Sequence, residues 1–390
     1  MRANSKASKA AKKILSLAFI AAGIAFSATQ LAEGGASPAP AQNASETPNV
    51  QNTTLETRAV NGSLADTLRD IAARADKPEW LAYTVPQIAG DRTVCCGNWN
   101  NNDDGYGNCG TCRLEKENGM TTSTQKNSSS GGTVQLEGSR QLLVLFRLED
   151  KQVMRIRQAS ENCTLDAGGL HFIFLTGVKP AESVAVLADF VHKSTFEGHG
   201  DHEVGQGALS AIALHDGTSA DRAFESFVAP DQPEQLRKHA SFWLGEARGK
   251  PGEQLLQKMA KNDPSSEVRS QVTFALSVSR EPEALAEMIR MAKEDESNHV
   301  RGQALFWLAH KAGEKAMTAI TGAIDNDPDT EVKKKAVFAL SQMPKDEGVP
   351  KLIEVAKNNR NREVRKQAMF WLGQSNDPRA LEFFEQVLTR

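Results

Sequence analysis

Residues 300–308 read Val-Arg-Gly-Gln-Ala-Leu-Phe-Trp-Leu, and close copies of this stretch return along the C-terminal half of the chain. Its phenylalanine, Phe306, stands 32 residues from an equivalent phenylalanine on either side. The complete row is Phe242, Phe274, Phe306, Phe338 and Phe370. A constant period of this length is typical of proteins built from stacked repeats, in which each repeat packs mainly on its neighbours.

A second apolar row has the same period and lies in a different apolar stretch of each repeat: Leu256, Met288, Ile320, Leu352 and Phe384. Each repeat therefore contains two amphipathic segments, each long enough for about three helical turns. Asp-Pro pairs at 263–264, 327–328 and 377–378 lie between them. Aspartate can cap the incoming helix, and proline fits its first turn. The sequence predicts helix A, an Asp-Pro-type turn, helix B and a short loop.

The quoted motif resembles the HEAT-repeat family, and more closely the short bacterial HEAT-like repeats of phycobilisome lyases. The resemblance covers residues 182–390 and implies an all-α solenoid with a 32-residue period. It implies a fold and no particular activity. The phycobilisome lyases share the repeat pattern alone, and nothing in the sequence identifies a bilin pocket.

At about 100° per residue, Val300, Ala304, Trp307 and Leu308 define the core stripe of helix B. Trp243, Trp307 and Trp371 alternate with Ala275 and Ala339 at one position, and we expect these tryptophans to lie in the core. Arg301 and its equivalents point elsewhere, and Phe306 lies on the flank beside Gln303. The Phe row has two interpretations. It packs ring on ring between successive B helices, or it is partly exposed on the concave face as a peptide-binding groove. We expect the groove to use Phe274, Phe306, Phe338, Phe370, Gln271, Gln303 and Gln367.

The first 28 residues indicate export. Five basic residues precede an apolar run at 14–28 that ends in small residues, which is typical of a signal peptide. The alternative is an uncleaved membrane anchor, although the run is short for a spanning helix. We therefore expect a periplasmic or secreted bacterial protein, with membrane contact only if the segment is uncleaved.

Residues 29–61 are rich in Ala, Pro, Ser, Asn and Thr and are predicted to form a disordered tether. The chain has 390 residues, a formal net charge of −3 and a pI near 6.3. This balance, together with the export signal, argues against nucleic acid as a partner.

Residues 62–180 are predicted to form a small α+β domain that contains all the cysteines and a mainly antiparallel sheet. A helix capped by Ser63 comes first, and strand-like segments follow at 80–86, 141–148, 152–156 and 170–175. Residues 149–151 join two of these strands as a hairpin turn.

The five cysteines, Cys95, Cys96, Cys109, Cys112 and Cys163, have three interpretations. A disulfide framework is the default for an exported chain, and the odd number leaves one thiol over. A closed zinc site is the second, because Cys96, Cys109 and Cys112 have compatible spacing. A redox dithiol at 109–112 is the third.

Metal and catalytic patterns are weak elsewhere. Residues 100–105 match the first half of a calcium-binding loop, but the twelfth position of that loop is Thr111 and not the glutamate that binds calcium. His199 and His202 are three residues apart and could bind one metal ion together. Deoxyhypusine hydroxylases resemble the repeat architecture and bind iron through repeated His-Glu pairs. Here only His202-Glu203 is such a pair, so the resemblance does not extend to that chemistry. We expect neither a resident metal nor a cofactor.

The sequence hypothesis is a non-enzymatic, exported scaffold that binds a protein or peptide of the cell envelope on its solenoid surface. The alternative is a metal- or thiol-dependent envelope enzyme that uses the cysteine domain and docks its substrate on the repeats.

Overall fold

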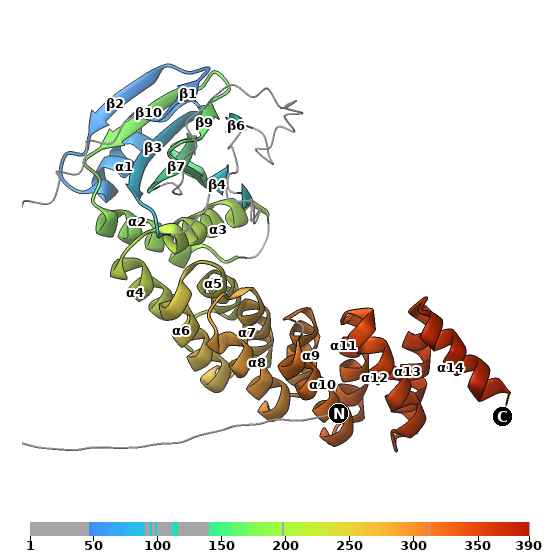
Figure 1. The fold of residues 1–390 in the computed structure, drawn as a ribbon. Coiled ribbons are helices and arrows are strands. Elements are labelled where there is room, and N and C mark those ends of the chain that lie inside the picture. The colour runs from blue at the N-terminus through green and yellow to red at the C-terminus, as the bar shows by residue number, and fades with distance from the viewer. Residues whose placement is uncertain are drawn as a thin grey trace, which may run out of the picture. The chain divides into compact units, whose positions relative to one another are not determined.

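A computed structural model describes residues 47–89, 94–95, 98–99, 111–115, 140–196, 199–311 and 313–389, all within one compact unit, Ser45–Arg390 (Figure 1). Ten strands and helix α1 (Leu64–Ala72) precede a continuous series of helices from α2 (Pro180–Lys193) onward. The predicted signal segment and Cys96 and Cys109 lie outside the described residues. Within the described part of the chain, no helix has the length and apolar content needed to cross a membrane.

The central sheet has five strands in the order β2-β10-β3-β7-β8. They are β2 (Leu55–Ala59), β10 (His171–Thr176), β3 (Glu79–Pro86), β7 (Gln141–Glu149) and β8 (Gln152–Ser160). The pairs β2–β10 and β10–β3 are parallel, whereas β3–β7 and β7–β8 are antiparallel. The sheet is therefore mixed: the pairings β3–β7 and β7–β8 are antiparallel, as predicted, whereas β10 lies between β2 and β3 and runs parallel to both. Helix α1 connects β2 to β3, which lets these two strands run in the same direction.

The sheet is covered on both faces, and this explains why β3 reads as an almost continuous apolar run. On one face, residues such as Leu81 and Phe146 share a core with α1, α2 and α3 (His199–Leu214). On the other face, Trp80 and Phe174 form a second core under a small sheet. That small sheet has the order β1-β9-β6, from β1 (Val50–Gln51), β9 (Thr164–Asp166) and β6 (Thr111–Arg113). A further pair, β4 (Val94–Cys95) and β5 (Asn98–Trp99), is antiparallel.

The predicted tether at 29–61 contains two strands at its C-terminal end, β1 and β2. In β2, Leu-Glu-Thr-Arg-Ala, the charged Glu56 and Arg58 are more buried than the exposed Leu55, so hydropathy gives no sign of a buried strand. Backbone pairing to β10 holds the strand at the sheet edge, and Arg58 pairs with Glu56 on its surface. Residues 29–46 lie outside the described residues.

The helices form the predicted solenoid of paired A and B helices. The B helices are α5 (Glu234–Ala247), α7 (Ser266–Val278), α9 (Asn298–Lys311), α11 (Thr330–Gln342) and α13 (Arg362–Gln374). Their first residues are 32 apart, as the sequence period requires. The A helices are α6 (Gly249–Asn262), α8 (Glu283–Glu294), α10 (Glu314–Asn326), α12 (Lys345–Asn358) and α14 (Pro378–Leu388), and α4 (Thr218–Phe227) comes before them.

Buried ion pairs connect successive repeats, and we call them the ion-pair ladder: Arg237–Asp263, Arg269–Asp295 and Arg301–Asp327. Each arginine lies on a B helix, and its aspartate lies in the A–B turn of the next repeat. In each pair Nε donates to Oδ2 at 2.8–2.9 Å and Nη2 to Oδ1 at 3.1 Å. Arg269 and Arg301 also donate to the backbone of the preceding turn, at 2.8 Å from the carbonyl oxygens of Asp263 and Asp295.

The prediction that Asp263 and Asp327 cap helix B was wrong. The N-terminal caps of α7 and α11 are Ser265 and Asp329, whose side chains accept from backbone N–H groups of the first turn. Asp263 and Asp327 instead accept the ladder arginines and one backbone N–H each, from Ser265 and Asp329. Asp377 does cap its helix, α14, as predicted.

The solenoid packs on the sheet through α3. At Gly207 a Cβ atom would lie 2.1 Å from the carbonyl oxygen of Ile156 in β8, so only glycine allows this approach. Glu203 of α3 forms an ion pair with Arg155 of β8. Gln158 donates to Ser210 at 2.7 Å in the buried part of the same contact.

Removing one ion pair of the ion-pair ladder should lower the stability of the folded chain. Arg269→Met leaves the Asp295 carboxylate buried without its partner, and we expect it to lower the free energy of unfolding by about 3–5 kcal/mol. Adding Asp295→Asn should recover a large part of that loss, because the uncompensated charge is removed. Urea denaturation of the two variants and wild type checks this, and fully additive losses would contradict it.

Candidate functional site

Aromatic rings form a continuous row along the B helices, which we call the aromatic ladder: Phe242, Trp243, Phe274, Phe306, Trp307, Phe338, Phe370 and Trp371. Two stacked pairs, Phe242–Phe274 and Phe306–Phe338, have ring centroids 5.9 Å apart. Tryptophans bridge between the pairs. Phe274 lies 4.7 Å from Trp307 and Phe338 lies 4.9 Å from Trp371, centroid to centroid.

The Phe rings pack between successive B helices and are also partly exposed: Phe274, Phe306 and Phe338 are half-buried and Phe370 is 55% exposed. That they form a peptide-binding groove stays a prediction. The bridging Trp307 is also half-buried, whereas the equivalent Ala275 is fully buried. The ladder is therefore rigid and partly accessible, which suits a surface that accepts apolar side chains.

The predicted glutamine row lies one turn N-terminal to the rings. Gln271, Gln303 and Gln367 stand three residues before Phe274, Phe306 and Phe370, so each amide lies on the same helix face as its ring. All three are half-buried, and within the described residues none of their side chains makes a hydrogen bond. The ladder thus has amide donors and acceptors beside it that can bind a peptide backbone.

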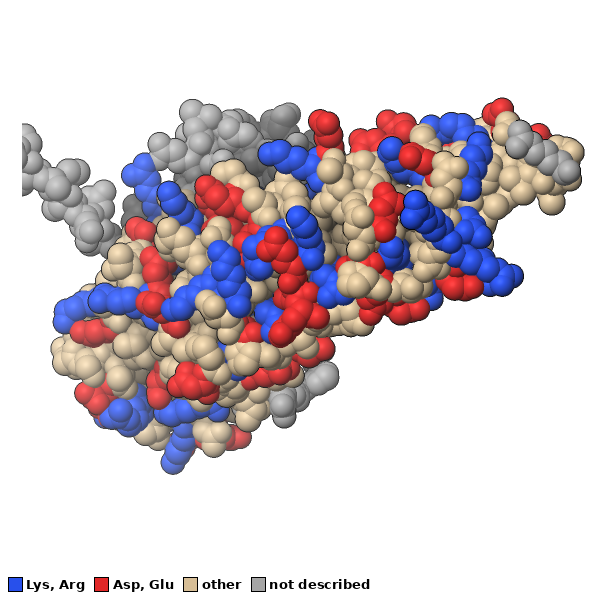
Figure 2. Space-filling view, turned by 90° about the horizontal axis from the view of Figure 1, so that it is seen from below, with Lys and Arg blue, Asp and Glu red and all other residues tan. Residues whose placement is uncertain are grey.

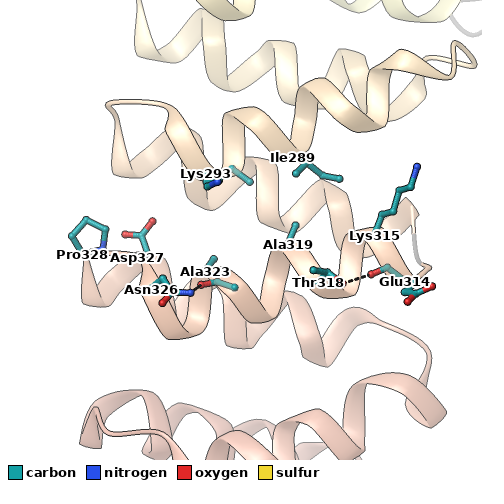
Figure 3. Close-up of a pocket in the computed structure, with 12 residues that line it drawn as sticks. Ile289, Lys293, Glu314, Lys315, Thr318, Ala319, Ala323, Asn326, Asp327 and Pro328 are labelled. Atoms are coloured by element: carbon teal, nitrogen blue, oxygen red, sulfur yellow. Dashed lines mark hydrogen bonds between the residues drawn. The ribbon is translucent and has the colours of Figure 1, made fainter.

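Sequence reasoning missed a groove of about 840 Å³ between α8 and α10. Ile289, Ala319 and Ala323 line its apolar floor, and polar side chains stand at its two ends (Figure 3). Lys293 and Asp327 stand at one end of the floor, and Glu314 and Lys315 at the other. Because both signs of charge are present at each end, the groove does not select for the charge of a ligand.

A comparison between repeats could have revealed this groove. Helix α10 has Ala319, Gly322 and Ala323 at three positions, and the corresponding positions of α8 hold Glu287, Arg290 and Met291. Nothing lies within 4 Å of a Cβ atom built on Gly322. The small side chains of α10 thus leave the space unfilled.

Two of the five predicted disulfide cysteines have described side chains. Cys112 and Cys163 are both disulfide-bonded and lie buried in the second core of the sheet domain. Cys163 Sγ lies 3.2 Å from the carbonyl oxygen of Val94, next to β4. The side chains of Cys95, Cys96 and Cys109 lie outside the described residues, so the pairing of the five stays a prediction.

The weaker metal patterns fall mostly on residues whose side chains the structure does not describe. The side chains of His199 and His202 and the half calcium loop at 100–105 lie outside the described residues. Glu203 pairs with Arg155 on the sheet and is engaged in packing. Among the described residues no three His, Cys, Asp or Glu side chains come together as a metal site.

A buried hydrogen-bonded chain connects the sheet to the first helices. Tyr83 Oη lies 2.8 Å from Ser183 Oγ, which lies 2.8 Å from His215 Nε2. His215 Nδ1 donates to the carbonyl oxygen of Ala211 at 2.7 Å, so Nε2 accepts from the serine hydroxyl. All three side chains are inaccessible to solvent. The serine–histidine pair therefore serves packing, because no substrate can reach it.

Stability should fall in acid because of His215. Burial lowers the pKa of His215 from 6.5 to about 4, so the unfolded chain binds a proton at a pH where the folded chain does not. This contribution is present above about pH 6.5 and is lost as the pH falls towards 4. We expect about 2 kcal/mol less unfolding free energy at about pH 5 than at about pH 7 from this group.

Urea denaturation at both pH values measures the loss. His215→Gln, which cannot titrate, is the matched variant, and its pH dependence should be smaller by that amount. An equal fall in wild type and variant would show that other groups cause the acid sensitivity.

Charged side chains of both signs are interspersed on the face of the molecule seen in Figure 2. Near the aromatic ladder, Lys334 pairs with Glu331 and Lys366 with Glu363, each at 3.0 Å. The basic stretch of α11 and α13 is thus partly neutralised within its own helices.

The family model that describes HEAT repeats matches residues 222–309 and 316–390. Residues 222–390 are therefore assigned to HEAT repeats, as the sequence motif predicted. No curated protein matches the chain.

Solved structures match the chain as well, among them two at low identity. Human deoxyhypusine hydroxylase in complex with glycerol is 15% identical over 53% of this chain and 90% of that chain, with a TM-score of 0.26. YibA of Escherichia coli is 17% identical over 53% of this chain and 76% of that chain, with a TM-score of 0.33.

Proposed function

We propose that this chain is an exported, non-enzymatic scaffold that binds a protein or peptide along the B-helix face of its HEAT repeats. The observation that carries the proposal is the aromatic ladder, with half-exposed rings and Phe370 more exposed still. Rigid aromatic side chains commonly dominate the affinity of protein interfaces. The neighbouring amides of Gln271, Gln303 and Gln367 supply the polar contacts that orient an extended partner.

Export rests on the N-terminal sequence, where basic residues precede an apolar run at 14–28. Disulfide bonds at Cys112 and Cys163 are consistent with an oxidising compartment, because cytosolic reductants keep most thiols reduced. The partner on this proposal is a protein or peptide of the cell envelope.

A crosslinking experiment tests the surface. A photoreactive phenylalanine analogue at Phe370 should capture a partner in cell-envelope extract. The same analogue at Leu381, which is 63% exposed on α14 and is not a member of the ladder, is the matched control and should capture none. Phe306→Ala with Gln303→Ala should weaken capture at position 370 about tenfold or more.

Circular dichroism must show that the double variant keeps its helices. Equal capture from positions 370 and 381, or capture that the folded double variant leaves unchanged, would contradict binding along the aromatic ladder.

A further inference from the structure

Two residues of the B helices depart from the repeat pattern and meet in space. The position of Gly302 holds Lys238, Ser270, Lys334 and Lys366 in the other repeats. The position of Lys335 holds His239, Gln271, Gln303 and Gln367. A Cβ atom on Gly302 would lie 2.3 Å from Lys335 Cδ and 3.0 Å from its Nζ. The lysine side chain of α11 therefore lies against α9 at Gly302, and a side chain at position 302 would displace it.

Glycine at this position opposes helix stability. Gly302 is a buried interior residue of α9, where alanine or serine would favour the helix more. Without a Cβ at this position, the side chain of Lys335 can lie between α9 and α11.

The ammonium group of Lys335 has no carboxylate partner among the described residues. Its neighbours Lys334 and Lys366 each pair with a glutamate of the same helix, Glu331 and Glu363. The hydrogen bond from Lys366 lowers the pKa of the Glu363 carboxyl, and Arg362, which also lies near it, adds to this effect. The local surface therefore has a small excess of positive charge, to which Lys335 contributes, and such a surface favours a short acidic segment.

Lys335 lies beside the centre of the aromatic ladder. It precedes Phe338 by three residues on α11, so the two side chains share a helix face. Phe338 stacks on Phe306 with the ring planes 9° apart. An extended peptide places alternate side chains on one face about 7 Å apart. A residue that contacts the Phe306–Phe338 pair would therefore place the side chain two positions away near Lys335.

From this geometry we infer that the partner bound on the aromatic ladder is an acidic, extended peptide segment. It carries an apolar residue on the Phe306–Phe338 pair and an Asp or Glu two positions away that pairs with Lys335. This inference rests on the proposed function, because it needs a partner on the B-helix face. It adds the chemistry of that partner and makes Lys335, held by Gly302, a specificity-determining residue.

Two labelled peptides test the inference against the full chain. One contains three Phe-Ser-Asp-Ser units, and the other has Asn in place of each Asp. Fluorescence anisotropy should show the acidic peptide binding about fivefold more tightly than the amide peptide, a size expected of a part-exposed ion pair. The preference should shrink at high salt, which screens such a pair.

Three variants distinguish a specific contact with Lys335 from general attraction between the acidic peptide and a basic surface. Lys335→Gln restores the amide found in three other repeats and should bring the two affinities together. Gly302→Ala should do the same because its Cβ displaces the lysine, and its urea midpoint should be unchanged or higher. Lys366→Gln, a lysine paired with Glu363, should keep the preference for the acidic peptide.

Each remaining outcome overturns the inference. If wild type bound both peptides with equal affinity and Phe306→Ala bound neither, the aromatic ladder would be a binding surface that does not prefer acidic peptides. An equal loss of preference in Lys366→Gln and Lys335→Gln would show diffuse charge attraction. If neither peptide binds, the acidic partner is wrong, and the crosslinking at Phe370 separately decides whether the surface binds at all.

Discussion

The ion-pair ladder is the constraint that sets the offset between the repeats from α5 to α11. A single pair of helices cannot bury its apolar side, so each repeat needs a neighbour at a fixed offset. Apolar packing alone tolerates sliding between helices, whereas a buried guanidinium–carboxylate pair does not, because each displaced charge would be left without compensation. Arg269 illustrates the point, since it holds the turn before it at Asp263 and the turn after it at Asp295.

This constraint stops before the last repeats. Lys333 takes the place of the next arginine and donates to the backbone of Asp325, and Asn359 takes the place of the next aspartate. Arg365 then donates only to backbone carbonyl oxygens, those of Asn359 and Arg360. From α11 onward apolar contacts and the aromatic ladder stack the repeats, together with hydrogen bonds between uncharged side chains such as Asn361 Nδ2 to Thr330 Oγ1 at 3.1 Å. Lys335 and Phe338 therefore lie where the charged connections between repeats have ended.

The 32-residue period predicted the solenoid because every repeat contains the same local pattern of apolar and polar residues. The 32-residue spacing gave the start of every B helix, and the assignment to HEAT repeats confirms the family resemblance. Contacts far apart in the sequence were not predictable in this way. A helical wheel gives Arg301 a direction but cannot show that its partner is Asp327, 26 residues on. Parallel pairing of β2 with β10 joins residues more than 100 positions apart, and the polar sequence of β2 contains no sign of it.

In the candidate site, too, the features that recur in every repeat were predictable from the sequence and the others were not. The rings of Phe306 and Phe338 were predictable because they recur, but recurrence alone could not tell packing from exposure, and the structure shows that they do both. A repeated residue is largely committed to the contact with its neighbour, which every repeat must make. Selectivity for a partner must therefore come from residues that break the pattern. Gly302 and Lys335 break it and lie next to each other, so a departure from the repeat pattern coincides with a cation beside the aromatic ladder.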